Sequence, residues 1–90
     1  MARYIIERNV EGLEDPTVES LYAGGLESKK VARELGIIWI RSYVSEAEGK
    51  IYCEYEAPGP ELILEHARRI GLPADKISEV KLEISPDMFV

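Results

Sequence analysis

Residues 36–56 read GIIWIRSYVSEAEGKIYCEYE, and this stretch decides the fold. Its first part, GIIWIRSYV (36–44), and its last part, KIYCEYE (50–56), are rich in β-branched and aromatic residues, as strands are. The polar segment SEAEG between them ends in glycine, which is typical of a turn. The stretch therefore predicts a β-hairpin of two antiparallel strands.

The period of two along a strand assigns the hairpin side chains to two faces. We predict one mostly apolar face that pairs Val44 with Ile51, Ser42 with Cys53 and Ile40 with Tyr55. On the opposite face we predict the pairs Tyr43 with Tyr52, Arg41 with Glu54 and Trp39 with Glu56. A shift of one residue in this register would move every side chain to the other face.

The residues before the hairpin predict a strand and a helix. RYIIER (3–8) has strand composition, and Asp15 followed by Pro16 is typical of a helix start. Gly36 ends the helical pattern as a C-cap. Gly24 and Gly25 interrupt the helix, as a hinge or as a place where helix and sheet pack closely. The apolar residues at helical spacing are Val18, Leu21, Tyr22, Leu26, Ala32 and Leu35.

The residues after the hairpin predict a second helix and a last strand. PGPELILEHARRIGLP (58–73) has a proline in its first turn and Gly71 at its end, and ISEVKLEI (77–84) alternates as a strand does. SPDMFV (85–90) cannot continue that strand past Pro86, and its apolar residues are expected to cover an edge or a partner subunit. The order is βαββαβ, which predicts an α+β ferredoxin-like sandwich: a four-stranded antiparallel sheet with two helices on one face.

Length and composition restrict the class of protein. Ninety residues, of which 46% are hydrophobic, predict one domain over residues 1–90. The longest apolar run, GIIWI, is too short to cross a bilayer, and no secretory signal pattern is present at residues 1–12. A net charge of −6 and scattered lysines and arginines argue against nucleic acid as a partner. The single cysteine requires no oxidising compartment, so we expect a cytoplasmic protein.

Cys53 and His66, the only cysteine and the only histidine, are candidates for a catalytic pair, for metal ligands or for members of a packed interior. Cys53 falls on the apolar face, where a free cysteine behaves as a small hydrophobic residue. The helical pattern places His66 at the border of the core-facing stripe, hydrogen-bonded to the backbone or to Glu65. The sequence contains no established catalytic motif, so an enzyme is the less favoured class.

The sheet face without helices is the candidate contact surface, because the βαββαβ order leaves nothing to cover it. Its predicted side chains are Trp39, Arg41, Tyr43, Tyr52, Glu54 and Glu56. Tyrosine, tryptophan and arginine are enriched at the centres of interfaces, so we expect a homodimer through this face. The alternative is a small-molecule or ion site that includes Glu54 and Glu56.

The chain resembles a family of short bacterial ferredoxin-like proteins, one branch of which is described as nickel-binding or nickel-responsive. The resemblance rests on WIRSYV (39–44), KIYCEYEAP (50–58) and EHARRIGLPADKISEV (65–80). It implies a homodimeric βαββαβ protein, of the dimeric α/β-barrel type, that sequesters metal. In the family pattern the position of Arg41 is commonly histidine, and arginine cannot ligate a metal. His66 matches the family's E-H-A motif, so it and Glu65 are the implied metal ligands.

Three functions follow as hypotheses. The first is a non-catalytic protein that binds a ligand, namely nickel or another divalent metal. The second is an enzyme of the dimeric α/β-barrel type that processes heme or another small molecule, with Arg41, Tyr43, Glu54 and His66 lining a cleft. The third is a structural module that serves only for dimerisation.

Overall fold

The structure, a computed structural model, describes residues 1–10 and 18–90, with the side chain of Val18 left out. The predicted helix start at Asp15 and Pro16 lies outside the described residues. The elements, in chain order, are β1 (Ala2–Asn9), α1 (Val18–Glu34), β2 (Ile38–Ser45), β3 (Lys50–Ala57), α2 (Pro60–Ile70), β4 (Lys76–Val80) and a 3₁₀ helix, η1 (Pro86–Met88).

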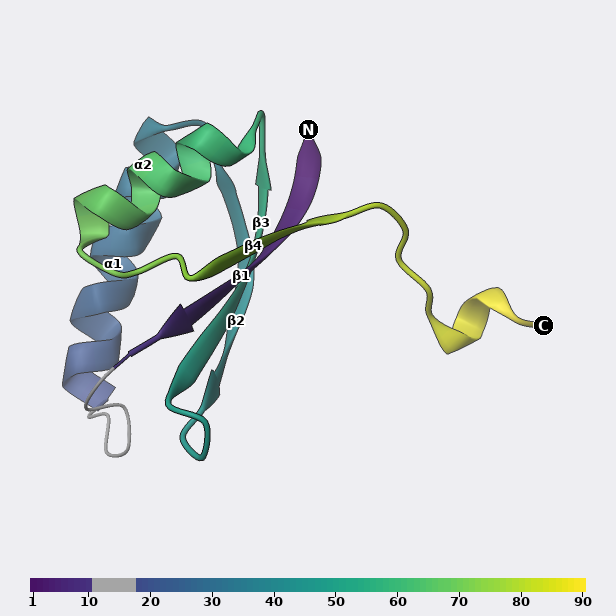
Figure 1. Cartoon of the computed structure of the whole chain (residues 1–90), viewed down its shortest axis with the longest axis horizontal. Coiled ribbons are helices and arrows are strands. Elements are labelled where there is room, and N and C mark those ends of the chain that lie inside the picture. Colours follow the sequence, from purple (N-terminus) through teal and green to yellow (C-terminus); the bar gives the residue numbers. More distant parts are fainter. Residues whose placement is uncertain (11–17) are drawn as a thin grey trace.

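The four strands form one sheet in the order β2-β3-β1-β4, and each neighbouring pair is antiparallel. Both helices lie on the same side of this sheet (Figure 1). This arrangement confirms the predicted α+β ferredoxin-like fold. Dimerisation into an α/β barrel stays a prediction, since the structure contains one chain.

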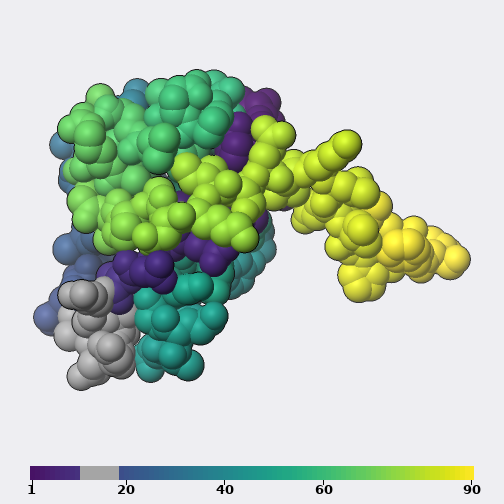
Figure 2. Space-filling model, in the orientation of Figure 1, coloured from purple at the N-terminus to yellow at the C-terminus, as the bar shows by residue number. Residues whose placement is uncertain are grey.

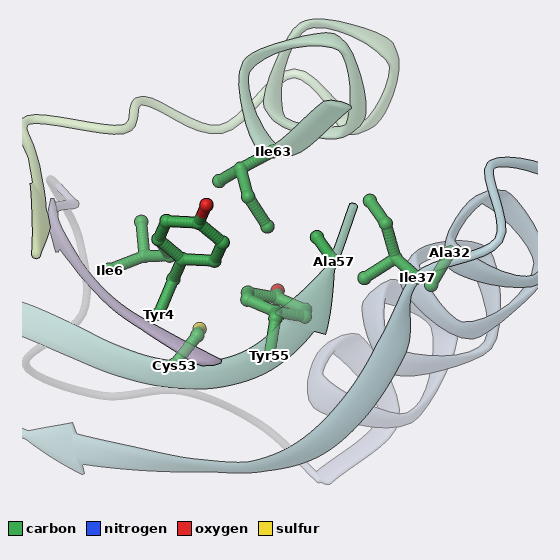
Figure 3. Packing of buried hydrophobic residues seen from close by; sticks show 8 residues of the cluster. All are labelled: Tyr4, Ile6, Ala32, Ile37, Cys53, Tyr55, Ala57 and Ile63. Carbon is green, nitrogen blue, oxygen red and sulfur yellow. The ribbon is translucent and has the colours of Figure 1, made fainter. Parts of the chain in front are cut away.

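The core lies between the sheet and the two helices. β1 contributes Tyr4 and Ile6, and β3 contributes Cys53, Tyr55 and Ala57, at alternate positions as the period of two requires. Figure 3 shows Ile63 reaching from α2 toward the ring of Tyr4. The predicted placement of Cys53 on the helix-covered face is confirmed, since only 4% of this residue is exposed.

Both helices end as the sequence predicts. Gly36 and Gly71 adopt φ angles of 70° and 73°, in the left-handed region that glycine enters without steric cost. The N–H of Ile37 then donates to the carbonyl of Ala32, and that of Leu72 donates to the carbonyl of Ala67. These bonds satisfy carbonyl groups that would otherwise be left unpaired at the helix ends.

Only the second half of α1 is packed in the interior, through Ser28, Val31 and Ala32. The apolar residues at helical spacing are therefore buried only in part, because Leu21, Tyr22 and Leu26 are exposed. The helix continues through Gly24 and Gly25 without a break. A methyl group added at Gly25 would lie 3.9 Å from Cη2 of Trp39, an ordinary contact distance, so this helix and the sheet are close here.

None of the described helices is long and apolar enough to span a membrane.

The last strand is shorter than the predicted 77–84. β4 ends at Val80, which is paired with Arg3 near the start of β1. Residues 81–84 pair with none of the described strands, although their sequence alternates, and Glu83 accepts a hydrogen bond from Nη1 of Arg3 on β1 over 2.8 Å. The chain from 81 to 90 leaves the body of the molecule (Figures 1 and 2). The radius of gyration is 13.8 Å, above the roughly 12 Å typical of a compact chain of this length.

Candidate functional site

The central hairpin has the predicted register over most of its length. Four predicted pairs are observed, namely Val44 with Ile51, Tyr43 with Tyr52, Ser42 with Cys53 and Arg41 with Glu54. Arg41, Tyr43, Tyr52 and Glu54 therefore point away from the helices, on the side that we call the open face. The open face also carries Glu56, through its pairing with Arg3 and Ile38.

A β-bulge at Ile40 changes the register at the start of β2. Trp39 pairs with Tyr55 and Ile38 pairs with Glu56, so the predicted pairs of Ile40 with Tyr55 and of Trp39 with Glu56 are wrong. A bulge inserts one extra residue and inverts the faces on one side of it. Trp39 consequently lies on the helix-covered side and packs against the core, and its placement on the open face is corrected.

The indole of Trp39 is held by a polar contact that explains its position. Its Nε1 donates to Oγ of Ser42 over 2.9 Å, and that hydroxyl donates to Sγ of Cys53 over 3.0 Å. Indole nitrogen is only a donor, so the direction of its bond to Ser42 is fixed. An outward indole would lose both this bond and its contact with the core.

Glu54 and its neighbours make the most connected group on the open face. The hydroxyl of Tyr43 donates to Oε1 of Glu54 over 3.0 Å, and Nε of Arg41 lies 3.9 Å from the same oxygen. Tyr43 itself is 53% exposed. Arg41 and Tyr43 therefore lie beside the same oxygen of Glu54, and the ring of Tyr43 is accessible to a partner.

The other open-face carboxylates are also paired with cations. Glu56 accepts from Nη2 of Arg3 over 3.2 Å, and Glu7 lies within 4 Å of both Lys50 and Lys76. Tyr52 turns to Glu48 in the hairpin turn, where its hydroxyl donates over 3.0 Å. This hydrogen bond, followed by burial, raises the pKa of Tyr52. A cation that bound Glu54 or Glu56 would have to displace an arginine.

His66 lies inside the molecule, fully buried between α2, α1 and β3. Its Nε2 is 3.0 Å from the carbonyl oxygen of Ser28, so this nitrogen carries the proton and donates. Its ring meets the ring of Tyr55 edge to face, with 5.3 Å between centroids. The predicted backbone hydrogen bond is observed, whereas the predicted border position is wrong. Burial, together with the charge of Arg8, lowers the pKa of His66.

Glu65 lies in different surroundings from His66, the next residue in the chain. Its carboxylate accepts from Nε and Nη2 of Arg68 over 2.7 and 2.9 Å, at the surface of α2. Arg69 lies 3.9 Å away from it as well. The two predicted metal ligands are therefore engaged by different partners.

The residues present in one chain do not fit a metal centre. No group of three or more histidine, cysteine, aspartate or glutamate side chains with metal-binding spacing occurs in the part of the chain that the structure describes. Nδ1 of His66 has no hydrogen-bond partner among the described residues, but it is fully buried, and the charge of Arg8 opposes a cation there.

Arg8 is a buried charged residue that the sequence did not identify as a candidate. It is fully buried, and it donates from Nη1 to the carbonyl of Pro73 over 2.8 Å and from Nη2 to the hydroxyl of Tyr55 over 3.2 Å. Its Nε has no partner, and the ring of Tyr55 lies 5.9 Å away. The alternation of Tyr4, Ile6 and Arg8 along β1 was the available signal, because it places all three on the same face.

The sheet separates the residues proposed for an enzyme cleft. Arg41, Tyr43 and Glu54 lie on the open face, whereas His66 lies beneath the helices on the opposite side. A single cleft lined by all four residues is therefore not present in this chain.

Comparison with known proteins places the chain in a family. A family model described as "SCO4226-like: Nickel responsive protein SCO4226-like" matches residues 4–80. The crystal structure of SCO4226 from Streptomyces coelicolor A3(2) is similar at 25% identity and a TM-score of 0.80, with 92% of this chain and 100% of that chain covered. No curated protein matches. Because the family model covers most of the chain, this protein belongs to the SCO4226-like family of nickel-responsive proteins.

Proposed function

We propose that this protein binds a divalent metal such as nickel without catalysis, as a homodimer that forms through the open face. The family supports the link to nickel, since it is described as nickel-responsive. The observation that carries the dimer is the open face itself, where Tyr43 and Ile38 are half exposed beside paired charges. We include a cytoplasmic location in this proposal, in keeping with the single cysteine.

Dimerisation supplies what one chain lacks as a metal site. A two-fold axis through the open face places the same surface of both copies in contact. It would bring two copies of Glu54 and Glu56 together, which gives four carboxylates, and nickel accepts oxygen and imidazole ligands. Arg41 and Arg3 would have to move away from these carboxylates when the metal binds. His66 and Glu65, the ligands that the resemblance implies, form a rival donor set in this proposal.

Isothermal titration of nickel chloride into the full chain tests the proposal. We expect a saturable heat that Glu54→Gln and Glu56→Gln reduce, and that Glu27→Gln, an exposed change on α1, leaves unchanged. If Glu65→Gln and His66→Gln lose this heat while Glu54→Gln keeps it, the metal site lies on α2 and not on the open face. Absence of any heat above the buffer control would remove the metal function.

The dimer is tested separately by sedimentation velocity without metal. A concentration-dependent dimer supports it, and a monomer at all concentrations contradicts it. A dimer that binds no nickel would favour the purely structural module.

A further inference from the structure

A hollow of about 720 Å³ lies between the second half of α1 and the outer strand β2. Its volume is within the range of sites that enclose a ligand or an anchoring side chain. Trp39, Ile38 and Ile40 supply apolar surface to it. The bulge at Ile40 therefore lies in the wall of this hollow.

The charge of the hollow is opposite to that of the whole chain. Lys29 and Arg33 of α1 line it, Arg41 reaches it from the open-face side of β2, and none of the lining residues that the structure describes is acidic, although the net charge of the chain is −6. Within the described residues Lys29 and Arg33 make no ion pair, and Arg41 is paired only at 3.9 Å. Three cations gathered at one place on an acidic protein, two of them without a described acidic partner, favour an acidic occupant.

The strand beside the hollow has a free edge. Among the strands that the structure describes, β2 is an outer one and pairs with β3 alone. Its outward N–H and C=O groups are available for a further extended segment. An occupant with extended backbone, apolar side chains and a negative charge would complement the strand edge and the hollow together.

The C-terminal segment, residues 81–90, has these properties. Its sequence alternates at 81–84, yet none of the described strands pairs with it, and its printed contact with the sheet is the hydrogen bond that Glu83 accepts from Nη1 of Arg3 over 2.8 Å. Leu82 and Phe89 are 72% and 73% exposed, which is unusual for large apolar side chains in a small domain. Asp87 accepts a hydrogen bond from Ser85, and this bond lowers the pKa of its carboxyl and keeps it charged.

The topology favours a second copy over the same chain as the source of this segment. β4, from which the segment leaves, and β2 are at opposite edges of the sheet. The segment points away from the body (Figure 1), so it would have to turn back across the open face to reach its own hollow. In a symmetric pair the segment of each copy can reach the other, since ten extended residues span up to about 33 Å.

We infer that residues 81–90 of one copy occupy the hollow beside β2 of a second copy. Residues 81–84 lie along the free edge of β2, Met88 and Phe89 enter the hollow, and Asp87 faces Lys29 and Arg33. The exchange is reciprocal, so the two copies make two such contacts. This inference is independent of nickel, and it adds a contact to the proposed open-face dimer.

Disulfide trapping between two different chains tests the inference. One chain carries Ile38→Cys and a size tag, and the other carries Phe89→Cys, while Cys53 is buried in both. We expect the mixed disulfide under mild oxidation to form roughly tenfold faster than with Glu46→Cys in the hairpin turn as the partner of Phe89→Cys, because docking raises the effective concentration. Asp87→Lys should slow the trapping, and Arg33→Glu in the tagged chain should restore it.

The trapping also has results that overturn the inference. Mixed disulfide no faster than in the Glu46→Cys control means that the segment does not dock beside β2. If a chain that carries both Ile38→Cys and Phe89→Cys forms only the intramolecular disulfide, the segment docks on its own chain. Failure of Arg33→Glu to restore trapping with Asp87→Lys removes the proposed charge contact. None of these results depends on nickel, so they are distinct from failure of the titration.

Discussion

Nη2 of Arg8 lies 3.2 Å from the hydroxyl of Tyr55, and both side chains are almost completely buried. The phenol is therefore one of two acceptors for a guanidinium that has no carboxylate beside it among the described residues. Arginine stays charged when buried, so it depends on these acceptors.

Tyr55→Phe should destabilise the fold by about 1–3 kcal/mol, because it leaves a buried donor of Arg8 without its partner. Urea denaturation followed by circular dichroism measures this loss. Tyr22→Phe, on the exposed part of α1, is the matched control and should have little effect. Equal stability of Tyr55→Phe and the wild type would show that the Arg8 contact contributes nothing.

The stability of the protein should fall between pH 10 and pH 12 in part because of Tyr55. Burial is the main cause that raises the pKa of this phenol, to about 12 from its ordinary value of 10.0. The unfolded chain therefore loses the proton at lower pH than the folded chain, and unfolding is favoured as the pH rises through this window. The urea midpoint of Tyr55→Phe should decline less steeply over the same range. A parallel decline in both proteins would contradict the raised pKa.

His66 should make the fold less stable as the pH falls below 6.5. Its pKa is lowered by burial in the folded state, so the unfolded chain takes up a proton first. It is the single histidine of the chain, which makes the slope between pH 7 and pH 5 informative. His66→Gln should flatten this slope in urea titrations. An unchanged slope would assign the acid sensitivity to other groups.

Trp39→Ala should cost about 3 kcal/mol of folding stability, in the range found when large aromatic residues are removed from a core. The indole packs against the core and donates to Ser42, so the loss is one of packing and of a hydrogen bond. Thermal unfolding measures it, and Trp39→Phe should recover most of the packing. Normal stability with weakened self-association would instead return Trp39 to an interface.

Tyr43→Ala should weaken the proposed dimer about 30-fold, which corresponds to roughly 2 kcal/mol for a residue at an interface centre. Tyr43 is half exposed on the open face and is held toward Glu54 by its hydroxyl. Sedimentation equilibrium gives the dissociation constant, with Tyr22→Ala as the control on the helix side. A dissociation constant equal to that of the control would exclude the open face as the contact.

Much of the fold could be predicted because local signals agree with one another. The glycines at positions 36 and 71 marked the two helix ends, and alternation placed Cys53 and Tyr55 on the same face. Burial along α1 could not be predicted in the same way, since periodicity gives the apolar side of a helix but not how far the sheet extends beneath it. Leu21 and Tyr22 lie where α1 is not covered.

The candidate site was predictable only in part, for a specific physical reason. Four hairpin pairs followed from the period of two, but one inserted residue at Ile40 turned Trp39 to the other side. No local pattern distinguishes a bulge from a regular strand when isoleucine and tryptophan fit both faces. Arg8 was not predicted for another reason, because the alternation along β1 places it on the buried face while charged side chains are rarely buried completely.

The amino-acid sequence by itself determined the order of elements, the helix ends and an open sheet face rich in tyrosine and glutamate. Those features depend on residues a few positions apart, so the local sequence is sufficient to predict them. The tertiary structure decided which side received Trp39, how His66 and Arg8 were buried, and where the cationic hollow formed beside β2. Each of these depends on groups far apart in the chain, such as α1 with β2 and β1 with Pro73, which only folding brings together.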